Sequence, residues 1–136
     1  MKKTQITILG AGFAGISALN ILKKHPNLHI TLINKTDHFL FTPLLPEVTT
    51  DRLEKKHITI PLKEFCNQNN IRLVVEKAKE INFNDRTIRT TNQSISYDYL
   101  ITAPGSLTNY FGVEGAEEEC FALKTIADAK KFINHC

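Results

Sequence analysis

The residues Ile6–Gly15, with the sequence ITILGAGFAG, decide the fold of this chain. The apolar run Ile6–Leu9 ends at three spaced glycines, Gly10, Gly12 and Gly15, and an apolar-periodic segment follows directly. This G-x-G-x-x-G pattern is typical of a strand–turn–helix unit that binds a dinucleotide. Gly10 permits the tight turn, Gly12 lets a pyrophosphate approach the backbone, and Gly15 lets the helix lie close to the strand. A glycine-rich turn without a ligand is the alternative.

The pattern continues as a β-α-β unit, with a helix predicted over 13–24 and a second strand over 29–34. Dinucleotide folds place an acidic residue at the end of this second strand, where it binds the ribose hydroxyls. Asn34 occupies that position, nineteen residues after the last glycine of the motif. Its amide can accept one hydroxyl hydrogen bond and donate another. The neighbouring Lys35 could pair with a 2′-phosphate, so NADP remains an alternative ligand. A second alternative is that Asn34 is a plain strand-end residue without a ligand.

The residues 37–48, DHFLFTPLLPEV, are predicted to form an apolar loop because Pro43 and Pro46 interrupt helices and strands. This loop either packs on its own core or lines an apolar pocket. A polar surface loop is predicted over 49–60, a helix over 61–69 and a strand over 71–76. Cys66 shares the apolar face of the helix, which favours a buried thiol over a nucleophile.

An antiparallel excursion is predicted after Ala78, because the apolar period changes to two. Turns at 84–85 and 92–93 separate three strands, the last of which covers 95–103. The predicted fold class is therefore α/β, a Rossmann-like parallel sheet with an inserted three-stranded antiparallel β-meander. A loop over 107–120 and a helix over 124–136 complete the chain.

Composition limits the classes of function. The 136 residues fit one domain, and the net charge of +3 comes partly from scattered lysine pairs, which argues against nucleic-acid binding. There is no apolar run long enough to span a membrane and no signal-peptide pattern, so a cytoplasmic location is expected. The three cysteines and five histidines lack the spacing of metal ligands, so no metal site is predicted.

Five stretches of the chain together resemble one family. They are GAGFAG (10–15), TLINK (31–35), HFLFTPLLPEV (38–48), YDYLITAPGS (97–106) and TNYFGVEGAEEECFALKTIADA (108–129). This order resembles the N-terminal portion of type II NADH dehydrogenases, the single-subunit NADH:quinone oxidoreductases, which are two-dinucleotide-binding-domain flavoproteins. The first and fourth stretches mark only the superfamily, whereas the third and fifth are more specific to the quinone-reducing branch.

The resemblance implies that the bound dinucleotide is FAD. The glycine motif would hold its pyrophosphate, Asn34 and Lys35 match the ribose and adenine end, and the backbone of Ala78 matches an adenine contact. Ala103–Gly105 match the turn that returns the chain near the flavin, and Phe41–Leu45 match the segment near the isoalloxazine and quinone. The implied cofactor-binding residues are Gly10, Ala11, Gly12, Phe13, Ala14, Gly15, Asn34, Lys35, Ala78, Ala103 and Gly105.

In the family, NADH transfers a hydride to FAD, and the electrons then pass to a membrane quinone. The flavin carries this chemistry, so no catalytic side chain is assigned. The resemblance implies NADH and quinone as partners and leaves a homodimer open. It implies a peripheral location on the cytoplasmic face of the membrane, through C-terminal elements that are missing here. Two departures are Asn34 in place of the acidic residue and Pro104 where threonine is common.

The family also needs a second glycine-rich unit for NADH, which this chain lacks. We therefore expect residues 1–136 to be the N-terminal part of an FAD/NAD(P)-binding domain, with the NADH-binding domain and C-terminal region absent. Alone, the chain should be inactive and bind FAD weakly or not at all. The alternatives are a sulfide:quinone oxidoreductase, for which Cys120 is the candidate cysteine, another FAD-dependent pyridine nucleotide oxidoreductase, or a non-catalytic nucleotide-binding module.

Overall fold

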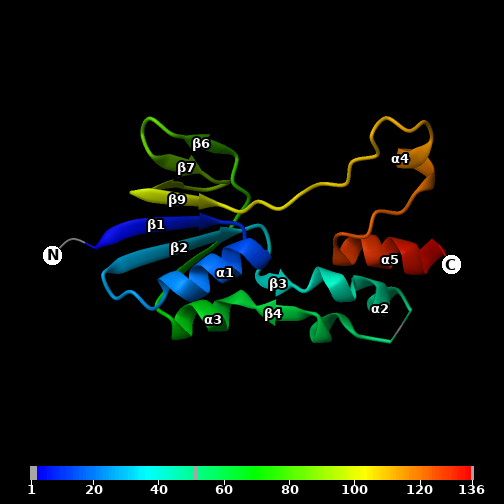
Figure 1. The fold of residues 1–136 in the computed structure, drawn as a ribbon, viewed down its shortest axis with the longest axis horizontal. Helices are drawn as coiled ribbons and strands as arrows, with labels where there is room; N and C mark the ends of the chain where they lie inside the picture. Colours follow the sequence, from blue (N-terminus) through cyan, green and yellow to red (C-terminus); the bar gives the residue numbers. More distant parts are fainter. Residues whose placement is uncertain (1–2, 51, 136) are drawn as a thin grey trace. The chain divides into compact units, whose positions relative to one another are not determined.

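The computed structural model describes residues 3–50 and 52–135. The contacts divide the chain into two compact units, each assembled from two stretches. The first unit comprises the residues up to Phe39 together with Pro61–Gly105. The second comprises Leu40–Ile60 together with the residues from Ser106 onwards. Figure 1 traces the chain through both.

A four-stranded parallel sheet with the order β5-β2-β1-β9 forms the centre of the first unit (Figure 1). Its strands are β1 (Thr4–Leu9), β2 (Leu28–Asn34), β5 (Arg72–Val75) and β9 (Tyr99–Thr102). Leu9, at the end of β1, pairs with Ile33 on one side and with Thr102 on the other. The carboxyl ends of three neighbouring strands therefore meet at one edge, and the predicted parallel sheet is confirmed.

Two helices lie on the same side of this sheet, α1 (Phe13–Leu22) and α3 (Leu62–Gln68) (Figure 1). Both agree with the predicted helices to within two residues. Alternate residues of the strands point toward them, as the period of a β-strand requires. The buried residues of this layer are Ile6, Ile8, Ala11, Leu19, Ile30, Leu32, Phe39, Leu62, Cys66 and Ile71.

A three-stranded antiparallel sheet covers the opposite face of the parallel sheet (Figure 1). Its strands are β6 (Glu80–Asn82), β7 (Thr87–Arg89) and β8 (Ser94–Ser96). Ile88 and Ile95 from this meander pack in a buried cluster with Ile33 and Val74 of the parallel sheet. The first unit therefore has three layers, and the predicted inserted meander is confirmed.

The single strand predicted over 95–103 is wrong, because the chain forms two strands there in different sheets. β8 ends at Ser96, and β9 starts at Tyr99 beside β1. Asp98 makes the break: its carboxylate accepts the Gln5 amide at 2.7 Å, and its own amide donates to the Gln5 carbonyl at 2.9 Å. The apolar alternation of the sequence runs through this point, but in the structure Ile95 and Tyr97 are buried under the meander, whereas Tyr99 is exposed and Leu100 packs against that cluster.

The loop predicted over 37–48 is also wrong in part. It contains β3 (His38–Leu40), the 3-10 turn η1 (Thr42–Leu44) and the short helix α2 (Leu45–Thr49). Pro43 and Pro46 each stand in the first turn of a helical segment, where the missing N–H costs nothing. The predicted loop over 49–60 likewise contains η2 (Lys55–His57), and β4 (Thr59–Pro61) pairs with β3.

The second unit has a smaller core of Leu45, Ile58 and Ala129. Ala129 belongs to α5 (Ile126–His135), close to the predicted start at Thr125; position 136 of the prediction lies outside the described residues. Thr125 and Asp128 cap this helix reciprocally, since each side chain accepts the other's backbone amide. The predicted loop over 107–120 contains one further short helix, α4 (Ala116–Glu119).

Candidate functional site

Gly10 ends β1 with φ +101°, a conformation that glycine adopts far more readily than other residues. Its amide donates to the carbonyl of Ile33, at the end of β2, at 2.8 Å. A Cβ on Gly10 would overlap the carbonyl of Ala103, just after β9. The amide of Ala103 in turn donates to the Leu9 carbonyl at 2.7 Å. The turn glycine thus lies where three strand ends meet, with the predicted Ala103 against it.

Gly15 and Gly12 differ in their surroundings. A Cβ on Gly15 would overlap the carbonyl of Gly10 and lie 3.6 Å from Ile8 Cγ2, so this position holds α1 close to β1 as predicted. A Cβ on Gly12 would meet no heavy atom within 4 Å. Packing therefore does not require a glycine at position 12, and the open space beside it is where a ligand could approach the backbone.

Among residues 3–50 and 52–135, no side chain caps the N-terminus of α1. Gly12 is its N-cap residue, without a side-chain cap hydrogen bond, and the first turn carries no acidic residue. The first intrahelical bond runs from the Ile16 amide to the Gly12 carbonyl at 2.9 Å. The amides of Ala14 and Gly15 precede it and have no intrahelical acceptor. Together with the helix dipole they form an electropositive end that suits a phosphate.

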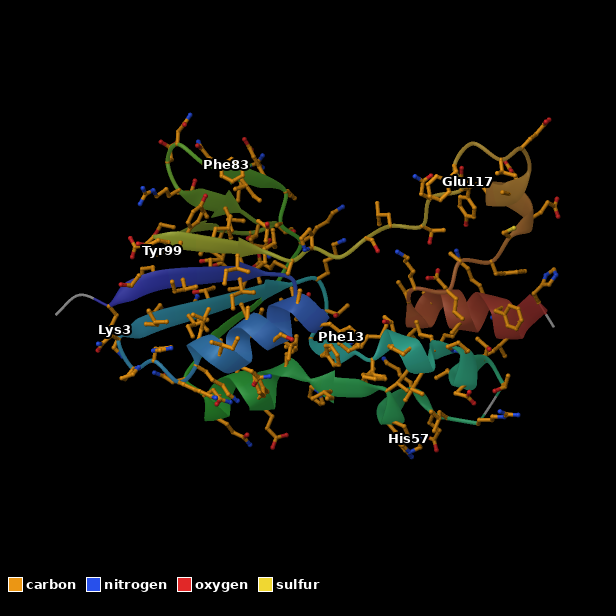
Figure 2. The ribbon with its side chains drawn as sticks, in the orientation of Figure 1. Lys3, Phe13, His57, Phe83, Tyr99 and Glu117 are labelled. Carbon is orange, nitrogen blue, oxygen red and sulfur yellow. The ribbon has the colours of Figure 1, made fainter. Side chains whose placement is uncertain are left out.

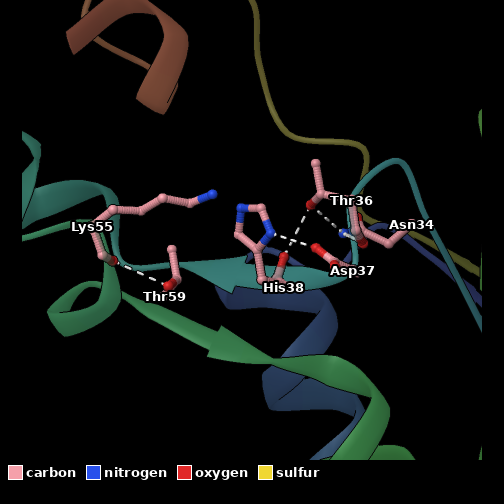
Figure 3. A network of polar contacts seen from close by, with 6 residues as sticks. All are labelled: Asn34, Thr36, Asp37, His38, Lys55 and Thr59. Carbon is pink, nitrogen blue, oxygen red and sulfur yellow. Dashed lines mark hydrogen bonds and ion pairs between the residues drawn. The ribbon is translucent and has the colours of Figure 1, made fainter. Parts of the chain in front are cut away.

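Asn34 is hydrogen-bonded to this turn and to Thr36, and Figure 3 draws its bonds to Thr36. Its Oδ1 accepts the Ala11 amide at 3.0 Å, and its Nδ2 donates to Thr36 O at 2.9 Å and to Thr36 Oγ1 at 3.1 Å. The Thr36 hydroxyl donates to the His38 carbonyl at 3.0 Å, and His38 Nδ1 bonds to Asp37 at 2.8 Å. The sequence prediction missed Thr36, although an asparagine two residues before a threonine is a local hydrogen-bonding pattern that could have indicated it.

The other predicted site residues are spread over the first unit. Phe13 is 48% exposed and packs its ring edge against Phe39, with centroids 5.2 Å apart (Figure 2). Ala14 and Lys35 are exposed, as is Gly105, which has φ +80°. Ala78 packs against the cluster under the meander. The structure therefore brings Gly10, Ala11, Asn34 and Ala103 together through contacts of the backbone and of the Asn34 side-chain amide.

Glu76, directly after β5, is a second polar residue that the sequence prediction missed. Its carboxylate accepts the Thr90 hydroxyl at 2.5 Å, the Gln93 amide group at 2.9 Å and the Asn92 backbone amide at 3.0 Å. These hydrogen bonds, that from Thr90 foremost, lower the pKa of Glu76 to about 2. Glu76 therefore ties the turn between β7 and β8 to the end of β5.

The cysteines agree with the prediction made for Cys66. Its side chain is fully buried, and this burial raises the pKa of the thiol. A buried thiol of raised pKa is a poor nucleophile. Cys120, in the second unit, is exposed.

A separate hollow of about 620 Å³ lies over α3 and β5. Lys63, Asn67 and Arg72 contribute polar groups to it, and Ile71 and Leu73 form its apolar wall. None of the residues Gly10–Gly15 lines it, so this hollow is distinct from the glycine turn.

The family model for pyridine nucleotide-disulphide oxidoreductases matches residues 4–135, nearly the whole chain. The chain belongs to this family. The matched range includes the glycine turn and the meander, so the family assignment covers the region whose geometry suits a dinucleotide.

Relatives confirm the predicted resemblance to type II NADH dehydrogenases. A type II NADH:quinone oxidoreductase of Staphylococcus epidermidis is 26% identical over 98% of this chain and 34% of its own length. Among solved structures, the sulfide:quinone oxidoreductase of Aquifex aeolicus has a TM-score of 0.88 and 32% identity over 97% of this chain and 31% of its own. NDH2 of Plasmodium falciparum, in complex with NADH, has a TM-score of 0.83 and 29% identity over 96% of this chain and 28% of its own.

This chain spans between 24% and 34% of the length of the curated relatives it matches. Within residues 3–50 and 52–135, no helix has the length and hydrophobicity needed to cross a membrane.

Proposed function

We propose that this chain is the FAD-binding segment of an NADH:quinone oxidoreductase. The observation that carries the proposal is the uncapped α1 N-terminus, which opens beside Gly12 at the edge where β1, β2 and β9 end. The similarity to quinone oxidoreductases from several organisms supports a quinone as the electron acceptor.

The residues present fit a dinucleotide. Gly12 leaves room for a pyrophosphate beside the backbone, and the absence of acidic residues from the first turn of α1 avoids repulsion of its charge. In our proposal the turn residues hold the pyrophosphate, Lys35 and the backbone of Ala78 lie toward the adenosine, and Ala103–Gly105 lie toward the flavin. When bound, FAD supplies the hydride and electron chemistry between NADH and quinone. The protein binds and orients it.

We further propose that the complete enzyme is a peripheral protein on the cytoplasmic face of a membrane and that the 136 residues alone do not oxidise NADH. An antibody against this segment tests, in the native cell, whether the segment belongs to a longer protein. A band about three to four times larger than 15.4 kDa, the ratio that 24–34% coverage implies, is expected. A band at 15.4 kDa would favour the non-catalytic module instead.

Binding at the turn is tested by titrating the complete enzyme, stripped of its flavin, with FAD and comparing Gly12→Val, because the isolated 136 residues are expected to bind FAD weakly or not at all. The structure has room for a side chain at position 12, so this substitution should change the free energy of unfolding by no more than about 1 kcal/mol. It should nevertheless weaken FAD binding at least tenfold, because the valine would occupy the phosphate's path. Ser17→Val, on an exposed position of the same helix, is the matched control. Equal FAD affinity for the wild type and Gly12→Val would contradict the proposal.

A sulfide:quinone oxidoreductase is the second candidate, because the Aquifex aeolicus enzyme with that title matches the fold with a TM-score of 0.88. Sulfide oxidation in this class uses cysteine near the flavin, and Cys120 is exposed. Replacing Cys120 with serine in the complete enzyme separates the two candidates. Loss of sulfide-dependent quinone reduction would favour the second candidate, whereas unchanged NADH-dependent activity would favour the first.

A further inference from the structure

We propose that Asn34 and Thr36 form a positioning pair that holds the glycine turn in its anion-binding conformation, and that Asn34 does not act as a two-hydroxyl ribose clamp. The proposal rests on the function proposed above and assigns Asn34 a role that its place in the dinucleotide pattern does not predict. It is carried by the hydrogen bond from the Ala11 amide to Asn34 and by the bonds from Asn34 to Thr36, the latter drawn in Figure 3.

The Asn34 side chain is engaged within the protein through both of its polar atoms. An asparagine amide has two N–H donors and one carbonyl oxygen with two lone pairs. Nδ2 lies within hydrogen-bond distance of two oxygens of Thr36, the carbonyl at 2.9 Å and the hydroxyl at 3.1 Å. Oδ1 accepts the Ala11 amide at 3.0 Å. A ribose clamp that accepts from one hydroxyl and donates to another would compete with these internal bonds.

The orientation of the amide is also determined. The opposite orientation would point Nδ2 at the Ala11 N–H and Oδ1 at the Thr36 carbonyl, which places donor against donor and acceptor against acceptor. A carboxylate at this position would place an oxygen against the same Thr36 carbonyl, and neither group would have a hydrogen to donate. The amide therefore matches this environment, whereas the acidic residue usual at the end of this strand does not.

The backbone on both sides of Asn34 is fixed. Its carbonyl accepts the Glu76 amide at 2.9 Å, and the preceding carbonyl, of Ile33, accepts the Gly10 amide at 2.8 Å. Two successive amides of the turn, those of Gly10 and Ala11, are thus bound to the end of β2. The turn is held before any ligand arrives, which reduces the ordering cost of binding.

Hydrogen exchange of the Ala11 amide in the ligand-free 136-residue chain is the direct test. We expect Thr36→Val to accelerate this exchange roughly fivefold or more, because the network loses about one hydrogen bond. Thr36→Ser keeps the hydroxyl and should return the exchange rate to that of the wild type. The Gly10 amide is the internal control, because it donates to a backbone carbonyl that these variants leave intact. Thr108→Val, at an exposed position of the second unit, is the matched control variant. Unchanged Ala11 exchange in Thr36→Val would overturn the proposal.

Titration of the complete enzyme, stripped of its flavin, with ADP gives a second test, in which the two roles of Asn34 predict changes of opposite sign in ADP affinity. If the pair positions the turn, both Asn34→Asp and Thr36→Val weaken ADP binding roughly fivefold, although Thr36 is not among the proposed ligand contacts. If Asn34 were a ribose clamp, Asn34→Asp would tighten ADP binding and Thr36→Val would leave it unchanged or tighter, and this result would also overturn the proposal. Absence of ADP binding by the wild type would count against the proposed function, and Ala11 exchange would then decide the proposal by itself.

Discussion

The two compact units differ in how completely they bury their own apolar residues. In the first unit, the sheet is covered by helices on one face and by the meander on the other, and Ile8, Leu19 and Leu32 are fully buried. Among its described residues, the second unit buries only Leu45, Ile58 and Ala129. Its residues Leu107–Leu123 include large apolar side chains that are mostly exposed, such as Phe111 at 85%. The candidate dinucleotide turn belongs to the unit whose core is the more complete, as a rigid binding turn requires.

The largest expected effect comes from the core of the first unit. Leu32→Ala removes a fully buried side chain from the central strand β2, between two paired neighbours. We expect the free energy of unfolding of this unit to fall by about 2–5 kcal/mol, because a close-packed site between sheet and helices cannot collapse around the cavity. Exchange of the buried amides of β1 and β2 measures the change. A loss below about 1 kcal/mol would contradict the more complete core that we assign to the first unit.

Leu45→Ala applies the same change to the second unit. Leu45 is also fully buried, but its cluster has few members and includes short helical segments that can adjust. We expect a loss near the lower limit for such substitutions, about 2 kcal/mol. Amide exchange in α5 is the measurement. A loss equal to that of Leu32→Ala would show that the two cores are equally well packed.

Glu76→Gln tests the clamp between β5 and the meander through its pH dependence. The pKa of Glu76 is lowered from 4.5 to about 2 in the folded protein, so its ionised form stabilises the fold above pH 4.5. This contribution disappears as the pH falls from 4.5 toward 2. We expect the melting temperature of the wild type to fall more steeply over that window than that of Glu76→Gln. Parallel curves for the two proteins would contradict the lowered pKa.

The smallest effect is expected at the exposed surface of the second unit. Phe111 has φ +53°, an unfavourable conformation for an aromatic residue. Phe111→Asn should change the free energy of unfolding by no more than about 0.5 kcal/mol, toward greater stability, because asparagine tolerates this conformation. Thermal unfolding measures the change. A loss of more than about 1 kcal/mol would indicate that the exposed ring contributes to the unit's own stability.

Prediction from the sequence succeeded where the signal was local. The glycine motif, helices α1 and α3 and the first two strands of the meander follow from short periodicities and turn residues. It failed at the boundary between β8 and β9 and at the prolines of η1 and α2. In the first case an unbroken alternation conceals a change of pairing partner, and in the second a proline is compatible with a helix start as well as a break.

The sequence by itself determined the strand–turn–helix unit, because Gly10, Gly12 and Gly15 act through backbone freedom and close approach at fixed spacing. Tertiary structure alone decided what surrounds each glycine. The carbonyl of Ala103, which is distant in the chain, excludes a side chain at Gly10, whereas Gly12 faces open space. It also decided that Asn34 bonds to Ala11, which lies 23 residues earlier in the chain. Such contacts depend on strands pairing across many residues of chain, and no local pattern of residues specifies that pairing.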